Sequence, residues 1–253
     1  MQLIRSLTFN ALMYLAMLVL GVWYLPQAIF SRDKALEACK VYCAWVRWSA
    51  ERIVGLRTEV RGPVPTGECI VAAKHQSFLD IIIIFSAVPR GRFIMKSILK
   101  WAPILGWFAL RIGCVPVDRG KRSEAIRKMV ADVKSGALEP GQLIIYPQGT
   151  RVAPGVFVPY KIGAAILQQE TGQAVVPAAT NVGVFWPRHG FLRRPGLAVV
   201  EFLPAIEPGM EPKAFLARLQ AEVEGTSDRL MSEAGWQGPV LPDPGPAERG
   251  PLG

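Results

Sequence analysis

The longest uncharged stretch of the chain is its N-terminal segment, residues 7–30, which reads LTFNALMYLAMLVLGVWYLPQAIF. Its 24 residues exceed the roughly 20 apolar residues that a helix needs to cross a bilayer. The segment therefore predicts membrane attachment. Asn10, Gly21 and Pro26 interrupt it, so a spanning helix and an interfacial or re-entrant helix are both open. A cleaved signal peptide is a further alternative, although no small-residue cleavage site follows.

The charge balance points to an anionic partner. The chain carries 29 Lys and Arg against 20 Asp and Glu, a net charge of +9, while 51% of its residues are hydrophobic. A chain that is both basic and apolar favours anionic membrane lipid over nucleic acid. Positive charge is also greater after the apolar segment than before it, where Arg5 stands, so the positive-inside rule places the rest of the chain in the cytoplasm.

The remainder of the sequence predicts an α/β domain between two different ends. The spacing of apolar residues predicts a helix over residues 31–57, so that residues 1–57 form membrane-anchoring helices. Residues 58–234 alternate short apolar runs with helical segments, and residues 235–253 form a Pro- and Gly-rich tail that we expect to be disordered. Strands are expected at 69–73, 92–95, 114–117, 143–146, 174–179 and 197–203. Helices are expected at 80–88, at 97–113 with a break at Pro103, and at 123–135, 161–171 and 212–234; the four isoleucines at 81–84 suit a strand as well.

The cysteines and histidines do not suggest a metal site. Cys39, Cys43, Cys69 and Cys114 lack paired C-x-x-C spacing, and the chain has two histidines. We therefore expect no metal and no redox cofactor. Cys39 and Cys43 are expected to act as small apolar residues on one helix face.

A polar loop, KHQSFLD, follows the expected strand at 69–73. If His75 lies in the loop and Asp80 in the first turn of the next helix, the carboxylate can meet one imidazole nitrogen and leave the other free to take a proton. The alternative is that Asp80 only caps the helix. A hydrolase that uses Ser77 as its nucleophile is a weaker option, because no G-x-S-x-G motif accompanies it.

A second polar loop, YPQGTR at residues 146–151, follows the expected strand at 143–146. Arg151 offers a planar fork for a phosphate, Thr150 a hydroxyl donor, and Gly149 a backbone that an anion can approach. Alone, this loop is also consistent with an ordinary turn. Together with a histidine base, a basic chain and a membrane anchor, it suggests a phosphorylated lipid acceptor.

These motifs resemble those of the glycerolipid acyltransferases. KHQSFLD resembles their H-x4-D motif, and YPQGTR resembles F-P-E-G-T-R. Residues 93–119 resemble the intervening block, with Lys96, Pro103 and Gly106, and AVVPAATNVG resembles the late V-P-V motif around Pro177. The four blocks occur in the right order from Val71 to Gly183 and are most similar to those of the 1-acylglycerol-3-phosphate O-acyltransferases.

The resemblance implies a fold, a reaction and a location. It implies a single acyltransferase domain with a mixed central sheet flanked by helices, on the cytoplasmic face of a bacterial inner membrane. The implied reaction moves a fatty acyl group from acyl-CoA or acyl carrier protein to the free hydroxyl of lysophosphatidate, giving phosphatidate, with no cofactor. His75 would be the base and Asp80 its partner, and Gly149, Thr150 and Arg151 would hold the acceptor phosphate. Lys96 adds positive charge there or is a surface lysine.

One position departs from the family pattern. Gln148 stands where the family usually has Glu, so it keeps the hydrogen-bonding capacity but loses the charge. It is a further candidate for substrate binding, and it motivates the alternative of another lysolipid acceptor, such as a lyso-ornithine lipid. A non-catalytic membrane lipid-binding protein is the third hypothesis, against which the intact His75 and Asp80 count.

Overall fold

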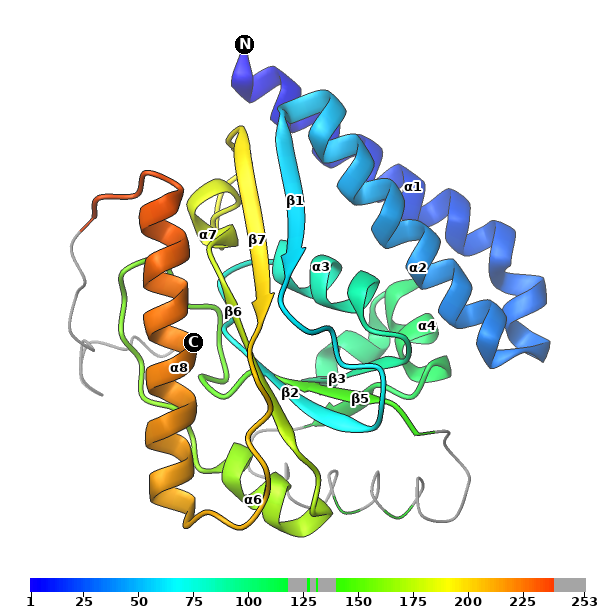
Figure 1. Ribbon diagram of the computed structural model, residues 1–253. Helices are drawn as coiled ribbons and strands as arrows, with labels where there is room; N and C mark the ends of the chain where they lie inside the picture. The colour runs from blue at the N-terminus through cyan, green and yellow to red at the C-terminus, as the bar shows by residue number, and fades with distance from the viewer. Residues whose placement is uncertain (118–126, 128–130, 132–139, 239–253) are drawn as a thin grey trace.

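The computed structural model describes residues 1–117, 127, 131 and 140–238 (Figure 1). Apart from two helical positions, 127 and 131, the polar helix expected at 123–135 lies outside the described residues. Most of the expected disordered tail, from residue 239 onward, lies outside them as well.

Among the described residues, a mixed sheet of seven strands forms the centre of the molecule, in the order β1-β7-β6-β2-β5-β3-β4. The pairing of β6 with β7 is antiparallel and every other neighbouring pair is parallel. The α/β fold with a mixed sheet is therefore confirmed. The strands are β1 (Leu56–Arg61), β2 (Cys69–Ala73), β3 (Gly91–Lys96), β4 (Val115–Val117), β5 (Gln142–Ile145), β6 (Val175–Thr180) and β7 (Gly196–Phe202).

Helices cover both faces of this sheet, and Figure 1 shows α1 to α4 on one side and α6 and α8 on the other. The helices are α1 (Gln2–Phe30), α2 (Arg32–Ser49), α3 (Leu79–Ala87), α4 (Leu105–Arg111), α6 (Gly163–Thr171), α7 (Val182–Phe185) and α8 (Pro212–Glu233). A π-helical turn, Ala50–Val54, extends α2, and a 3₁₀ turn, Ser97–Trp101, precedes α4.

The alternation of side chains along β2 explains the two layers. Successive strand residues point to opposite faces, so Val71 and Ala73 pack in the cluster that contains α3 residues. Ile70 and Ala72 pack instead in the cluster formed by α6 and α8. All five residues of β2 are buried, as expected for a central strand covered on both faces.

Helix α1 lies along the domain and exposes much of its apolar surface. Ser6, Phe9, Asn10, Met13, Gly21 and Ala28 form its buried side, and the outer side exposes large apolar residues such as Leu15, Val19, Val22 and Trp23. Polar residues near its N-terminus bind the loop between α7 and β7: the side-chain amides of Gln2 and Asn10 donate to the carbonyls of Arg193 at 2.8 Å and Phe191 at 3.0 Å. By length and composition α1 is a candidate membrane span, so the structure agrees with an apolar N-terminal helix.

Most predicted elements are present, but the short helix α7 was not predicted and the helix end near residue 55 was predicted wrongly. The helix predicted over 31–57 ends at Val54, because Gly55 adopts a left-handed conformation (φ 76°) that terminates helices. Leu56 and Arg57 belong to β1, a strand that the sequence did not predict, and Leu56 pairs with Gly196. The isoleucine run forms α3, as the helical interpretation required.

Gly106 allows α4 to begin directly over the preceding 3₁₀ turn. A methyl group on it would lie 2.4 Å from the Lys100 carbonyl oxygen and 2.5 Å from that of Leu99. We expect Gly106→Ala to lower the free energy of unfolding by about 1–3 kcal/mol, because the backbone must move to admit the methyl group. Thermal unfolding in detergent measures this change.

The matched control is Gly225→Ala in the interior of α8, where, among the described residues and apart from the adjoining helix backbone and chain neighbours, no atom lies within 4 Å of the added carbon. Because alanine has a higher helix propensity than glycine, we expect the free energy of unfolding of this variant to rise by about 0.5–1 kcal/mol. Equal melting temperatures for the two variants would contradict the argument.

Candidate active site

The candidate residues meet at one edge of the sheet because they follow neighbouring parallel strands. His75 comes two residues after β2, Tyr146 directly after β5, and Lys96 is the last residue of β3. Since β2, β5 and β3 are adjacent and parallel, their carboxyl ends lie at the same edge, where open α/β sheets bind ligands. The backbone N–H of Val152 also donates to the His75 carbonyl at 2.7 Å, which joins the two polar loops.

His75 and Asp80 form the pair that the sequence predicted. The Nδ1 atom of His75 lies 2.9 Å from Oδ1 of Asp80, which is fully buried near the start of α3. The second carboxylate oxygen, Oδ2, accepts the backbone N–H groups of Gln76 and Ser77, both at 2.8 Å. Asp80 therefore both orders the loop and binds the histidine.

This geometry fixes the tautomer of His75. An ionised carboxylate only accepts hydrogen bonds, so Nδ1 carries the proton and Nε2 keeps its lone pair. The side chain of His75 is 13% exposed, which leaves it reachable from solvent. Nε2 is thus placed to accept a proton from a bound hydroxyl. Ser77 uses its hydroxyl oxygen to accept the N–H of Leu79, and this contact explains the residue without a nucleophilic role.

Tyr146 is a site residue to which sequence reasoning gave no role. Its ring stacks on the imidazole of His75, with 3.9 Å between centroids and 18° between planes. Its hydroxyl donates to Oδ1 of Asp80 at 3.1 Å. Burial, and then the negative charge of Asp80, raise the pKa of Tyr146 well above its ordinary value, so the hydroxyl stays protonated. The available signal was its position directly after a strand, next to the predicted base.

The loop after β5 has cationic neighbours. Gly149 adopts φ 74°, and a methyl group on it would lie 2.6 Å from Nζ of Lys161. Arg151 is exposed, and its carbonyl accepts a hydrogen bond from Arg188 at 3.1 Å. Thr150, which lies between Gly149 and Arg151 in the sequence, is half-buried. Lys161 and Arg188 were not predicted as site residues, because each is distant in sequence from the YPQGTR motif.

The remaining candidates differ in exposure. Lys96 is exposed at the sheet edge that the other candidates share. Gln148 is buried, and its amide donates to Oε1 of Glu224 on α8 at 3.4 Å. Gln148 therefore points toward α8 and does not line the exposed part of the loop.

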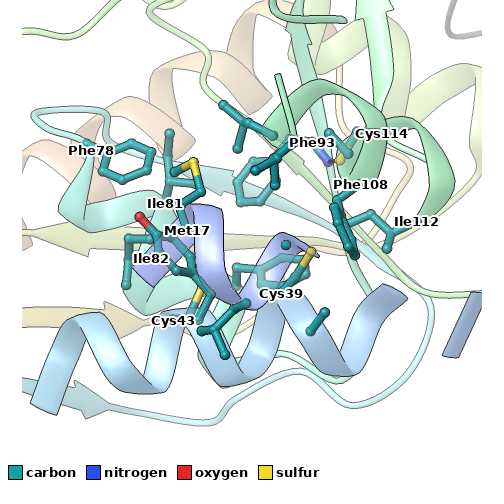
Figure 2. A pocket seen from close by; sticks show the side chains of 18 residues that line it. Met17, Cys39, Cys43, Phe78, Ile81, Ile82, Phe93, Phe108, Ile112 and Cys114 are labelled. Atoms are coloured by element: carbon teal, nitrogen blue, oxygen red, sulfur yellow. Dashed lines mark hydrogen bonds between the residues drawn. The ribbon is translucent and has the colours of Figure 1, made fainter. Parts of the chain in front are cut away.

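An apolar cavity of about 130 Å³ lies on the side of the sheet that α1 to α4 cover (Figure 2). Its lining comes from α1, α2, α3, α4 and β3, and Figure 2 shows Cys39 and Cys43 of α2 on one side, with Phe93 and Phe108 on another. The ring of Phe93 also stacks toward Tyr146, with 6.3 Å between centroids, so the cavity adjoins the histidine site. The sequence did not predict this cavity, because five separate elements build it. Cys39 and Cys43 line it as small apolar residues, as predicted.

A histidine bound to a buried carboxylate at the carboxyl edge of an α/β sheet can accept a proton from a bound group, a chemistry that several classes of enzyme use. Comparison with known proteins names the class: residues 57–181 match the sequence model of the Acyltransferase family. The chain belongs to this acyltransferase family.

Individual relatives agree with this assignment. The chain is 25% identical over 236 residues to the 1-acyl-sn-glycerol-3-phosphate acyltransferase of Pseudomonas aeruginosa, and the match covers 92% of each protein. It is 29% identical over 179 residues to the enzyme of that name from Saccharomyces cerevisiae, covering 69% of this chain and 58% of the yeast protein. The crystal structure of the acyltransferase PlsC from Thermotoga maritima shares the fold, with a TM-score of 0.77 and 20% identity over 94% of this chain and 98% of that one.

We expect Asp80→Asn to lower kcat for acyl transfer by about 10²- to 10⁴-fold, the range that general-base catalysis supplies. An amide has one acceptor oxygen, so it cannot accept both the Nδ1 proton of His75 and the backbone N–H groups of Gln76 and Ser77. Steady-state kinetics with the folded variant measure the effect. Asp33→Asn, which changes an exposed aspartate paired with Arg90, should retain wild-type kcat. A loss below threefold for Asp80→Asn would refute the assigned role.

Proposed function

We propose that this protein transfers a fatty acyl group from an acyl thioester to the free hydroxyl of 1-acylglycerol-3-phosphate, producing phosphatidate. The observation that carries the proposal is that the His75–Asp80 pair lies next to the loop that carries Arg151 and is linked through the rings of Tyr146 and Phe93 to an apolar cavity. A lysophosphatidate needs both, because it presents a hydroxyl group between an acyl chain and a phosphate.

The reaction proceeds by direct attack. Nε2 of His75 removes the hydroxyl proton while the oxygen attacks the thioester carbonyl carbon. The tetrahedral intermediate collapses, the C–S bond breaks, and the leaving thiolate takes the proton from the imidazolium. Asp80 stabilises the imidazolium, and Tyr146 fixes the carboxylate through its hydroxyl. A thiolate leaves readily, so the reaction needs neither a covalent enzyme intermediate nor a metal or redox cofactor.

The loop after β5 would hold the acceptor phosphate. In this proposal Arg151 provides a charged donor and Thr150 a hydroxyl, while Gly149 lets the backbone stay close to the anion. Lys161, Arg188 and Lys96 add positive charge around the loop. Gln148 does not take part directly, because it is 1% exposed and its amide is turned to Glu224.

The position of Gln148 also bears on the alternative acceptor. The lyso-ornithine lipid hypothesis rested on the loss of the family's carboxylate at this position. Since the side chain of Gln148 faces α8, it gives no contact that would favour a different acceptor. Lysophosphatidate therefore remains the acceptor that we propose, and the donor is acyl-CoA or acyl carrier protein.

The acyl chain would enter from the membrane into the cavity. The helices that line the cavity also expose apolar surface, such as Trp23 of α1, which is 71% exposed; Trp101, in the 3₁₀ turn before α4, is 75% exposed. We propose that this side of the molecule enters the bilayer interface. Since one face of α1 packs along the domain and its N-terminal polar residues bind the loop before β7, α1 is better suited to lie in the interface than to cross the bilayer alone. The excess of positive charge after the apolar segment supports attachment at the cytoplasmic face.

The proposal predicts that release of thiol from acyl-CoA by the purified protein requires both lysophosphatidate and His75. We expect His75→Ala to lower the rate by at least about 10²-fold, because the hydroxyl then has no base. The matched control is His189→Ala, which removes the second histidine from an exposed position and should retain the wild-type rate. Detection of free thiol together with the phosphatidate product measures the reaction.

The outcomes separate the hypotheses. Thiol release without an acceptor would indicate thioester hydrolysis in place of transfer. A clear preference for a lyso-ornithine lipid in an acceptor panel would replace the proposed acceptor. Absence of turnover with acyl-CoA and acyl carrier protein donors, over the whole panel, would favour a lipid-binding role.

The cavity predicts how a variant with a smaller cavity selects among acyl donors of different chain length. Ala109 lines the cavity from α4, so Ala109→Phe should shorten the space available to an acyl chain. We expect the ratio of kcat/KM for long-chain over short-chain donors to fall about tenfold or more, since each displaced methylene changes binding by 1–3 kcal/mol. Ala217→Phe, on the exposed side of α8, is the control and should leave the ratio unchanged. An unchanged ratio for Ala109→Phe would show that the acyl chain binds elsewhere.

A further inference from the structure

Lys74 is a buried cation directly behind the active site. It precedes His75, and because side chains alternate along the end of β2, the two residues point to opposite faces of the sheet. Lys74 is 1% exposed, and its Nζ forms an ion pair with Oε2 of Glu224 on α8. A buried ammonium group requires such a counter-charge, because an unpaired one would pay the full cost of leaving water. Glu224 lies outside the matched family segment, residues 57–181.

The other oxygen of Glu224 binds two further segments. Oε1 accepts the hydroxyl of Tyr160 at 3.0 Å and the amide of Gln148 at 3.4 Å. Burial, and then the charge of Glu224, raise the pKa of Tyr160 well above its ordinary value, so its hydroxyl remains a donor. One carboxylate therefore joins the strand end that carries His75, the loop that carries Gly149 to Arg151, and the segment before α6.

The cluster of Lys74, Gln148, Tyr160 and Glu224 is balanced in charge. It contains one cation and one carboxylate, with two neutral donors. The Oε1 atom of Gln148 is buried and accepts no hydrogen bond from any residue that the structure describes, so one acceptor of this amide is unused. A glutamate at the same position would place a second carboxylate beside the first, with a single lysine to neutralise both.

We propose that Glu224 is a positioning residue of the active site and that its charge is the reason for an amide at position 148. From the α8 side of the sheet, Glu224 fixes the position of the strand end that carries His75 relative to the acceptor loop. This inference rests on the proposed acyltransferase function for its kinetic consequences, whereas the charge coupling between Glu224 and Gln148 does not depend on that function.

The test is an exchange of the two side chains in the full-length protein in detergent. Glu224→Gln leaves Lys74 buried without a counter-charge, and Gln148→Glu adds a second carboxylate. We expect each single variant to raise KM for lysophosphatidate about tenfold or more, while KM for the acyl donor changes less than about twofold, because the proposed substrate-binding segment that Glu224 contacts is the acceptor loop, through Gln148. The double variant restores one carboxylate and one amide, and we expect it to return within about threefold of wild type.

The matched control is Glu222→Gln, which removes a partly exposed carboxylate on the same helix, paired with Arg218. It should match the wild type in both KM values. Melting temperatures are measured for every variant. If a single variant does not fold at the assay temperature, a higher melting temperature of the double variant still reports the coupling between positions 148 and 224.

Two results would overturn the inference. One is a double variant whose loss equals the combined losses of the single variants in both kinetics and melting temperature. The other is a pair of folded single variants with wild-type KM for lysophosphatidate, which would limit Glu224 to anchoring α8. A wild-type protein without transferase activity would instead refute the proposed function, and the exchange would then be judged from melting temperatures alone.

Discussion

The parallel pairing of β2 with β5 is the constraint on which the active site depends. The register places Ala72 beside Ile145, so the two chains leave the sheet together. His75 and Tyr146 then stack, and the hydrogen bond from Val152 to the His75 carbonyl holds the two loops side by side. The two loops are more than 60 residues apart in the sequence. An antiparallel pairing of β2 with β5 would place them at opposite ends of the sheet.

Two carboxylates, one buried (Asp80) and one partly buried (Glu224), stabilise this edge from opposite faces. Asp80 binds His75, Tyr146 and the loop backbone on the α3 side. Glu224 binds Lys74, Tyr160 and Gln148 on the α8 side. Because His75 and Lys74 are consecutive, each carboxylate restrains one side of the same short segment, as the proposed role of His75 as a general base requires.

Much of this arrangement was predictable from local sequence pattern. The apolar runs located β2, β5, β6 and β7, and the five-residue spacing of His75 and Asp80 gave their contact. The strand β1 was missed because Gly55, a single residue, ends the preceding helix. Tyr146, Glu224 and the cavity were missed for another reason: their roles depend on contacts between segments that are distant in sequence. The same limit made Gln148 look like a lost carboxylate, whereas the structure places a carboxylate next to it from α8.

The N-terminal helix has a consequence for how the protein can be handled. Met17, Leu20 and Gly21 of α1 line the cavity, and the side chain of Ile104 packs directly against Gly21. Ile104 adopts φ 62°, a conformation that costs roughly 1–3 kcal/mol and that persists when surrounding packing enforces it. Helix α1 is thus also part of the cavity lining. A truncation designed to make the enzyme more soluble would remove part of the cavity lining and the packing that holds Ile104. Cutting the chain after α1 therefore cannot give a soluble protein with an intact cavity.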